Sequence, residues 1–287
     1  MPELPEVETT KRGIENQICH KRIVEIQIRH SQLRWPIPVE LKTILPGLVV
    51  DSVKRRGKYL LLKTAAGHVL IHLGMSGHLR VLSQPIPPGK HDHIDLVFED
   101  GTCLRYQDTR RFGAWLWTDQ APEDHPLLSK LGPEPLSDEF NPDYLWQATR
   151  DRNTAIKSFI MNSQQLVGVG NIYANESLFL SGLHPLKPAK DLSKLECANL
   201  VTQIRQVLSA AIEQGGTTLK DFLSPSGRPG YFVQKLLVYG RADQPCLNCG
   251  TVIERAVHFQ RASYVCPICQ PQPQPKKSRA KQEKKSK

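Results

Sequence analysis

Four cysteines near the end of the chain constrain its fold more strongly than any other feature. They form two short pairs, Cys246-Leu-Asn-Cys249 and Cys266-Pro-Ile-Cys269, with sixteen residues between the pairs. One Cys-x-x-Cys pair places two sulfurs close enough to bind a tetrahedral ion, and a second pair at this distance completes the site. The sequence therefore predicts one structural Zn²⁺ bound by Cys246, Cys249, Cys266 and Cys269, with a hairpin between the pairs.

The segment between the cysteine pairs is basic. It includes Arg255, His258 and Arg261. A zinc-pinned hairpin that presents arginines is more typical of a module that binds a polyanion than of a redox site. The alternative is a zinc ribbon that only holds the C-terminus together, and the cysteine spacing alone leaves both interpretations open.

Length and composition indicate a soluble globular protein of two ordinary domains. The chain has 287 residues, of which 39% are apolar and 23% charged. No apolar run approaches the about eighteen residues of a membrane span. The first residues are acidic and interrupted by prolines, unlike a signal or transit peptide. The remaining cysteines, Cys19, Cys103 and Cys197, are scattered and odd in number, which favours a reducing compartment where thiols stay free.

The positive charge of the chain is concentrated in its last residues. The formal net charge is +10, and residues 271–287 contain seven Lys or Arg against Glu283 alone, which leaves +4 for the rest of the chain. This tail is of low complexity, and we expect it to be disordered. It either adds nonspecific attraction to nucleic acid or aids solubility. A nucleic-acid role for the body must therefore depend on where its charges lie.

The first half of the chain predicts a β-rich sandwich or barrel with an N-terminal helix, residues 1–131. Pro5 suits a first helical turn, and Val7, Ile14 and Ile18 fall on one helix face. Asp100-Gly101 is a strong hairpin signal. Strand-like runs follow the helix at 58–63, 69–73, 94–98, 104–106 and 114–117.

The second half changes to a helical period after a proline-rich stretch. Residues 132–150 are predicted to be a linker and residues 151–238 a helical domain. One helix is expected from Asn171 to Leu180, and another begins at the capping box Ser193-Lys-Leu-Glu196. Residues 239–270 then form the zinc finger and 271–287 the disordered tail. The predicted fold class is α+β.

Several motifs, in order along residues 1–270, resemble the formamidopyrimidine-DNA glycosylase family. They are PELPEVE at 2–8, KYL at 58–60, HLGMSG at 72–77, RRFG at 110–113, GVGNIY at 168–173 and the four-cysteine hairpin. The resemblance implies a β-sandwich, a helix-two-turns-helix domain and a zinc finger. It also implies a monomeric, cytoplasmic enzyme of the bacterial type. Its expected partner is double-stranded DNA containing oxidised purines or abasic sites.

The resemblance implies a catalytic set of Pro2, Glu3, Lys58 and Arg261. Once Met1 is removed, the amine of Pro2 matches the nucleophile that attacks C1′ of the damaged nucleotide and forms an iminium intermediate. Glu3 matches the general acid. Lys58 matches a lysine that contacts phosphate and assists elimination, and Lys54, Arg55 and Arg56 are expected to share this phosphate contact. The implied activity is removal of 8-oxoguanine and formamidopyrimidines, followed by β,δ-elimination at the abasic site.

The resemblance also implies a set of DNA-contacting residues. Met75, Arg110 and Phe112 match residues that fill the gap left when a base is flipped out of the duplex. Thr109 occupies a position where some relatives are expected to have proline. This difference affects the expected shape of the loop and not the assignment of Arg110. Residues 215–222 and 227–231 match a loop that closes over the flipped base. The remaining implied DNA contacts are Asn171, His91, Arg152, His72 and Lys157.

Two other functions compete with this interpretation. One is a noncatalytic zinc-finger protein that binds damaged or bent duplex DNA, which would not need a free Pro2 amine beside Glu3. The other is the endonuclease-VIII-like sibling enzyme, which acts on oxidised pyrimidines. Leu4 and Val7 favour the purine-directed branch over this sibling.

Overall fold

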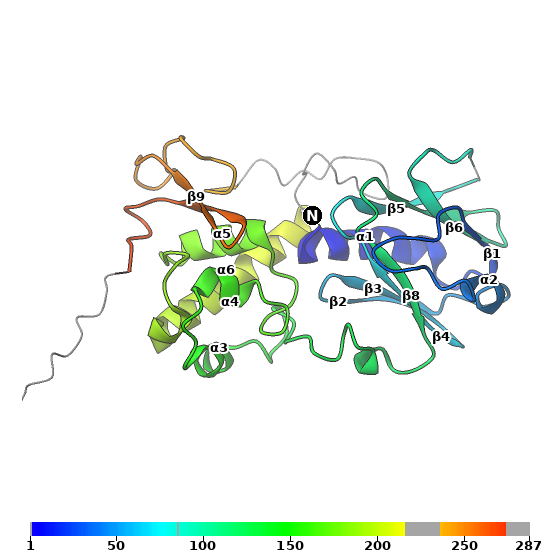
Figure 1. The fold of residues 1–287 in the computed structure, drawn as a ribbon, viewed down its shortest axis with the longest axis horizontal. Helices are drawn as coiled ribbons and strands as arrows, with labels where there is room; N and C mark the ends of the chain where they lie inside the picture. Colours follow the sequence, from blue (N-terminus) through cyan, green and yellow to red (C-terminus); the bar gives the residue numbers. More distant parts are fainter. Residues whose placement is uncertain (1, 85, 216–235, 274–287) are drawn as a thin grey trace, which may run out of the picture.

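The first half of the chain forms two four-stranded antiparallel sheets that share one core. The computed structural model describes residues 2–84, 86–215 and 236–273, and the two sheets make up one of its two lobes (Figure 1). One sheet has the order β1 (Ile23–Ile28), β6 (Asp92–Phe98), β7 (Cys103–Asp108) and β5 (Gly77–Leu82). The other has the order β2 (Ser52–Arg56), β3 (Tyr59–Thr64), β4 (Gly67–His72) and β8 (Ala114–Thr118).

The alternation of apolar residues explains how the sheets pack. Ile94, Leu96 and Phe98 of β6 are buried in the same cluster as Leu60 and Leu62 of β3, from the opposite sheet. The predicted Asp100-Gly101 hairpin is confirmed, because the Phe98 amide donates to the carbonyl of Thr102 at 2.9 Å. Strands β1, β2 and β5 were not predicted, since charged residues or glycine interrupt their apolar pattern. Short helical segments, α2 (Leu41–Ile44) and η1 (Pro122–Asp124), lie in the connections.

The predicted N-terminal helix is α1 (Leu4–Ile18), which lies with the sheets in the β lobe (Figure 1). Glu3 is its N-cap residue and forms a capping box with Glu6. Val7, Ile14 and Ile18 are buried in the sandwich core, as the helical period predicted. The start of α1 is directed toward the second lobe, so the first residues of the chain lie at the junction.

The second lobe is helical and has its own core. The predicted helix at 171–180 is α5 (Asn171–Leu180), and the Ser193 capping box begins α6. Leu200, Ile204 and Leu208 of α6 are buried against α5 and the neighbouring segments. The helical elements are α3 (Pro142–Thr149), α4 (Ile156–Ile160), α5, η2 (Ala189–Asp191) and α6 (Lys194–Glu213).

Helix α3 lies within the segment that was predicted to be a linker. The side chain of Asn141 accepts from the amide of Tyr144 at 2.9 Å and caps the helix, and Pro142 occupies its first turn. Leu145 is buried in the core of the helical lobe. Phe140 is buried in the same core, so we propose that this lobe begins at or before Phe140. The Asn-Pro helix start at 141–142 was a sequence signal for it.

The zinc module consists of a hairpin and a small core of its own. Strands β9 (Glu254–His258) and β10 (Arg261–Val265) pair antiparallel, and they lie above the helical lobe in Figure 1. The module's core joins Val238, Ile253 and Cys266 to Phe179 of α5. The predicted fold class is confirmed. Most of the predicted base-covering loop (216–222 and 227–231) and residues 274–287 of the tail lie outside the described residues.

Across the described ranges, none of the helices combines the length and the apolar character that crossing a bilayer requires.

Candidate active site

The start of α1 meets the start of α5 at the junction of the two lobes. The carboxylate of Glu3 accepts hydrogen bonds from the amides of Gly170 at 2.8 Å and Ile172 at 2.9 Å. The amide of Leu4 donates to the carbonyl of Gly168 at 3.0 Å. A Cβ on Gly170 would lie 2.3 Å from Cδ of Glu3, so this approach requires glycine. Residues that are 167 positions apart in the chain therefore form one site.

The environment of Glu3 suits a group that gives up a proton. Burial raises the pKa of its carboxyl above the ordinary value, while the Lys58 ammonium and the amides of Ile172 and Tyr173 oppose that rise. The N–H groups at the start of α5 have no partner within the helix. They donate to the Glu3 carboxylate instead and hold it in one orientation. A raised pKa enlarges the protonated fraction near neutral pH, which a general acid needs.

A second buried carboxylate, Glu6, supports the first. Its Oε2 accepts from the amide of Glu3 at 2.8 Å, and its Oε1 accepts from the Tyr173 hydroxyl at 2.7 Å. Pro2 is buried directly before Glu3. The predicted nucleophile and the predicted proton donor are therefore adjacent and held by both lobes.

Lys58 enters this site from the turn between β2 and β3. Its Nζ donates to the carbonyl of Val169 at 3.5 Å, just before α5. Burial lowers the pKa of its ammonium, the carboxylates of Glu3 and Glu6 raise it, and the charge of Arg261 lowers it further. Lys58 thus interacts electrostatically with both Glu3 and Arg261, although the three residues come from three separate segments. The structure brings the predicted catalytic residues together.

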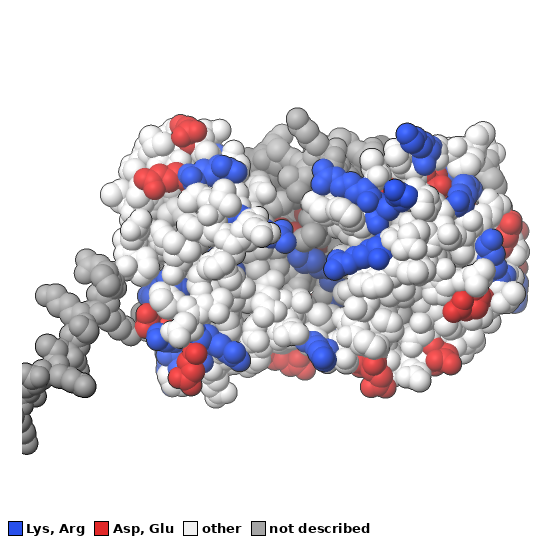
Figure 2. Space-filling model, in the orientation of Figure 1, with Lys and Arg blue, Asp and Glu red and all other residues white. Residues whose placement is uncertain are grey.

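A basic cavity of about 400 Å³ adjoins Lys58 between the lobes. Arg34, Lys58, His72 and Lys130 are among its lining residues, and none of those residues is acidic. Figure 2 shows Lys and Arg side chains gathered around the hollow between the lobes, with most Asp and Glu at the periphery. Such a surface suits a polyanion. Sequence reasoning missed Arg34 and Lys130, although the Arg34-Trp35 pair was an available signal.

His72 lines the same cavity, and its ring is held in place by the backbone that follows the end of β4. Its Nδ1 accepts from the Gly74 amide at 3.0 Å, and its ring lies 4.8 Å from the ring of Tyr59. Burial and the charges of Lys58 and Arg34 lower the pKa of His72 to about 4. The imidazole is therefore neutral at physiological pH and can offer DNA only its Nε2–H. The predicted DNA contact of His72 stays a prediction.

Met75, Arg110 and Phe112 lie together on two adjoining loops. The Arg110 guanidinium is 3.9 Å from the Met75 sulfur, and Phe112 is 50% exposed. The loops meet at Gly74, where φ is +66° and a Cβ would lie 2.4 Å from the carbonyl carbon of Phe112. Exposed apolar side chains on a rigid turn fit the predicted gap-filling role.

The fully buried Asp108 shapes these two loops. Its Oδ1 accepts from the Ser76 hydroxyl at 2.6 Å and from the Arg110 amide at 3.2 Å. Its Oδ2 accepts from the Gly113 amide at 2.9 Å and from the Tyr106 hydroxyl at 3.0 Å. The loop around Thr109 is therefore fixed by Asp108, which sequence reasoning did not single out.

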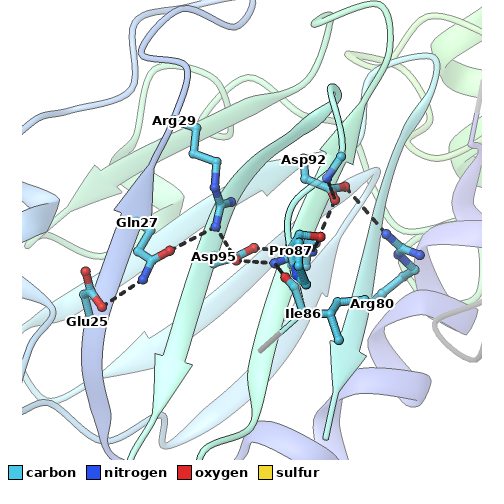
Figure 3. A network of polar contacts seen from close by, with 10 residues as sticks. Glu25, Gln27, Arg29, Arg80, Ile86, Pro87, Asp92 and Asp95 are labelled. Atoms are coloured by element: carbon cyan, nitrogen blue, oxygen red, sulfur yellow. Dashed lines mark hydrogen bonds and ion pairs between the residues drawn. The ribbon is translucent and has the colours of Figure 1, made fainter. Parts of the chain in front are cut away.

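A buried charge network fixes the loop before β6 to the sheet (Figure 3). His91 is the last residue of that loop. Arg105 donates to both carboxylate oxygens of Asp95, at 2.8 and 2.7 Å. The same guanidinium donates to the carbonyl of Ile86 at 2.8 Å, and Asp92 accepts from the amide of Gly89 at 2.8 Å. A bidentate arginine pair of this kind is geometrically specific. It gives the loop before His91 a defined position.

Arg152 and Asn171 were both predicted to contact DNA, and the structure places them differently. Asn171 is the first residue of α5, immediately beside the amides that bind Glu3. Arg152 is exposed on the turn after α3, where its carbonyl accepts from the Lys190 amide. Asn171 therefore adjoins the catalytic residues, while Arg152 lies on the surface of the helical lobe. Their DNA contacts stay predictions.

Lys157 has a different environment from the one expected of a DNA contact. It is 5% exposed, and its Nζ donates to the Ala262 carbonyl at 2.6 Å and to the Ser263 hydroxyl at 2.9 Å. Burial and the charge of Arg261 lower the pKa of its ammonium to about 8. These bonds fix the zinc hairpin to α4. The main role of Lys157 in this structure is therefore to position Arg261.

Two further buried residues of α5 hold the zinc module and were not predicted. The carboxylate of Glu176 accepts from three successive amides, those of residues 237, 238 and 239, at 2.8 to 3.0 Å. Asn175 accepts from the Tyr264 amide at 2.9 Å. No periodic pattern distinguishes these side chains from ordinary helix residues. They fix the orientation of β10, and therefore of Arg261, relative to Glu3.

The phosphate role expected of Arg55 and Arg56 does not fit their contacts. Arg55 pairs with Glu8 at 2.9 Å and with Glu134 at 2.7 Å. Arg56 donates to Glu134 and to the carbonyls of Leu131 and Gly132. Both guanidinium groups thus bind the segment that joins the lobes and are neutralised there.

The four cysteine sulfurs have the spacing of a tetrahedral metal site. All four Sγ atoms lie within 4.8 Å of one another, and three pairs are 3.4, 3.6 and 3.9 Å apart. Tetrahedral Zn²⁺ with sulfur ligands separates its sulfurs by about 3.8 Å. The residues therefore fit one Zn²⁺, in a closed site with no open position for catalysis.

Models of known protein families match most of the chain. The models of the formamidopyrimidine-DNA glycosylase N-terminal domain, its H2TH domain and the zinc finger found in FPG and IleRS match residues 1–115, 131–223 and 243–272. The chain belongs to the formamidopyrimidine-DNA glycosylase family. The predicted family, enzyme class and zinc finger are confirmed.

Relatives and solved structures of the family match almost the whole length of the chain. The formamidopyrimidine-DNA glycosylase of Hydrogenovibrio crunogenus is 61% identical over 272 residues, covering 95% of this chain and 97% of that protein. The crystal structure of the Thermus thermophilus Fpg protein superposes with a TM-score of 0.85 at 35% identity, covering 95% and 100% of the two chains. A complex of Lactococcus lactis Fpg with Fapy-dG-containing DNA superposes with a TM-score of 0.86 at 32% identity, covering 94% and 100%.

Proposed function

We propose that this chain excises oxidised purines, including 8-oxoguanine and formamidopyrimidines, from double-stranded DNA and then cleaves the strand at the abasic site. The observation that carries the proposal is the Glu3 carboxyl, which is buried on the N-terminus of α5 directly beside Pro2. Lys58 lies within its electrostatic environment, and Arg261 lies within that of Lys58. A noncatalytic DNA-binding protein would have no need for a buried acid at this position.

The chemistry begins at the amine of Pro2, once Met1 has been removed. Its lone pair attacks C1′ of the damaged nucleotide, the bond to the base breaks with its electron pair on the base, and the proton that the amine loses passes to the departing base. Glu3 protonates the sugar ring oxygen as the ring opens, which leaves an iminium between Pro2 and C1′. The iminium acidifies the C2′ proton, and its removal expels the 3′ phosphate. A second elimination releases the 5′ phosphate, and Lys58 and Arg261 neutralise the phosphates that depart.

The damaged nucleotide must leave the duplex to reach Pro2. Met75, Arg110 and Phe112 are placed together to fill the resulting gap, and the basic cavity beside Lys58 is suited to the bent strand. The structural Zn²⁺ has no chemical part in this scheme, because its four ligands close the site. The proposed location is the cytoplasm, in association with the bacterial nucleoid, and the proposed working form is a monomer.

Borohydride trapping tests the proposed function directly. Wild-type protein incubated with a duplex that contains an abasic site should become covalently attached on reduction, and the attached peptide should begin at Pro2. An oxidised-pyrimidine duplex and an 8-oxoguanine duplex, compared in parallel, separate this function from that of the pyrimidine-directed sibling. Binding to the abasic duplex without any covalent product would support the noncatalytic alternative instead.

Removal of the metal should weaken DNA binding strongly while the β lobe stays folded. Zinc supplies much of the folding energy of such a small module, and Arg261 lies on its hairpin. Chelation, or Cys249→Ser, should therefore weaken binding to an abasic-site analogue by at least about a hundredfold. Metal analysis should find one zinc per chain in the wild type, and Cys197→Ser is the matched control. Iron with a redox signal would contradict the zinc assignment.

The enzyme should prefer 8-oxoguanine paired with cytosine over the same lesion paired with adenine. Arg110 lies on the gap-filling loop, and a guanidinium offers only donors. Cytosine presents two adjacent acceptors on its pairing edge, whereas adenine presents one acceptor beside an amino donor. One good contact is worth about 1–3 kcal/mol, or roughly ten- to a hundredfold in rate.

Single-turnover excision from the two duplexes measures this preference. Arg110→Ala should remove most of the difference between them, while Arg152→Ala, which changes an exposed arginine on the turn after α3, should retain it. Equal rates for the wild type on the two duplexes would rule out a reading role for Arg110.

A further inference from the structure

The tip of the zinc hairpin adopts a backbone conformation that its residues do not favour. Phe259 and Gln260 form the two-residue turn between His258 and Arg261, with φ of +50° and +60°. Hairpin turns with two positive φ values favour Asn and Gly, and a bulky side chain there is a genuine outlier. A strained residue of this kind persists where it serves a purpose other than turn stability.

The side chain of Phe259 takes no part in the core of the zinc module. It is 71% exposed, whereas Val238 and Ile253, which form that core, are fully buried. A large aromatic ring held in solvent on a rigid hairpin loses little conformational freedom when it meets a partner. The exposure and the strained turn together indicate that the ring is presented for binding.

The surroundings of Phe259 indicate the chemistry of that partner. Beneath the tip is a cavity of about 200 Å³ whose lining includes Lys157, His258, Phe259 and Arg261 and contains no acidic residue. The acid of the hairpin, Glu254, lies at its opposite end, paired with Val265. A partner that suits both the cations and the ring carries phosphate groups together with flat or apolar surfaces.

Arg261, beside the hairpin tip, links the zinc module electrostatically to the catalytic centre. The charge of Arg261, adjacent to the turn, lowers the pKa of Lys58 and that of Lys157. Lys157 fixes the neighbouring residues 262 and 263 to α4. The position of Phe259 relative to Lys58 is therefore set by the fold and does not depend on a free hairpin.

We propose that Phe259 is a DNA-contacting residue whose ring packs against the sugar or base of the nucleotide next to the phosphate that Arg261 binds. This inference rests on the proposed function, since it places the damaged nucleotide beside Lys58. The ring stabilises the bent duplex through stacking and apolar contact, which no charged residue in the site supplies. It therefore adds affinity that does not depend on salt.

The test compares three variants on one probe, a fluorescent duplex that carries an abasic-site analogue. Phe259→Asn removes the ring and suits the positive φ, Phe259→Trp keeps an aromatic ring, and Val257→Thr changes an exposed neighbour on β9. Dissociation constants are measured at several salt concentrations, together with thermal stability and zinc content.

Phe259→Asn should weaken binding by about five- to a hundredfold at unchanged zinc content and equal or higher thermal stability. Its dependence on salt should match the wild type, because no cation is lost. Phe259→Trp and Val257→Thr should bind within about threefold of the wild type.

The proposal is overturned if Phe259→Asn binds like the wild type, if it loses zinc or stability, or if Phe259→Trp binds as poorly as Phe259→Asn. Failure of the wild type itself to bind the probe would instead count against the proposed function.

Discussion

Blocking the amine of Pro2 should abolish covalent trapping on an abasic duplex, with a fall of at least about three orders of magnitude. Adding one residue before Pro2 places its nitrogen in a peptide bond, where the lone pair is delocalised and no longer nucleophilic. The extension leaves the zinc site and the basic cavity unchanged. Binding to an abasic-site analogue should therefore be largely retained.

Borohydride trapping followed by mapping of the attached peptide measures this effect. Pro5→Ala is the matched control. Pro5 is also a buried proline, but it lies in the first turn of α1 and its replacement leaves the terminal amine unchanged. Trapping should persist in that variant. Efficient trapping of the extended protein through Lys58 would show that the lysine is the nucleophile and that Pro2 is not.

Local sequence patterns were sufficient to predict those features whose determining residues all lie within one short segment. The spacing of the four cysteines predicted the metal site, and the structure places their sulfurs at tetrahedral separations. The period of α1 and the Ser193 capping box were likewise predicted correctly, because a helix records its buried face and its start in consecutive residues. The same holds for the hairpin at Asp100-Gly101.

Contacts between distant segments could not be predicted in this way. Nothing in the sequence near Glu3 indicates that the amides of Gly170 and Ile172 bind its carboxylate. Lys157 illustrates the same difficulty, because its charge suggested DNA and its neighbours in space are the carbonyl and hydroxyl of the zinc hairpin. Charge indicates what a side chain can bind, and only the fold decides which partner is nearest.

The basic residues of β2 show how this affects functional assignment. Arg55 and Arg56 follow Lys54 in a run that looked suited to phosphate, yet their guanidinium groups are neutralised by Glu8 and Glu134. The cavity instead uses Arg34 and Lys130, which stand alone in the sequence. A cluster of charged residues along the chain is therefore weaker evidence for a binding surface than charged residues from separate segments that the fold brings together.

Glu3→Gln should slow base excision by about a hundred- to ten-thousandfold, which is the usual contribution of a general acid. The amide keeps the size of the side chain and one acceptor oxygen for the amides at the start of α5. Binding to an abasic-site analogue should therefore stay within about threefold of the wild type. Thermal unfolding checks that the variant is folded, and Glu15→Gln, elsewhere on α1, is the matched control.

The dependence of excision on pH separates a proton donor from a structural carboxylate. Burial raises the pKa of Glu3, so the wild-type rate should fall at high pH as the carboxyl loses its proton. The amine of Pro2 must be unprotonated to attack, so the rate should also fall at low pH. In Glu3→Gln the decline at high pH should disappear and the decline at low pH should remain. Normal excision by this variant, or an unchanged pH profile at a reduced rate, would remove Glu3 from the role of general acid.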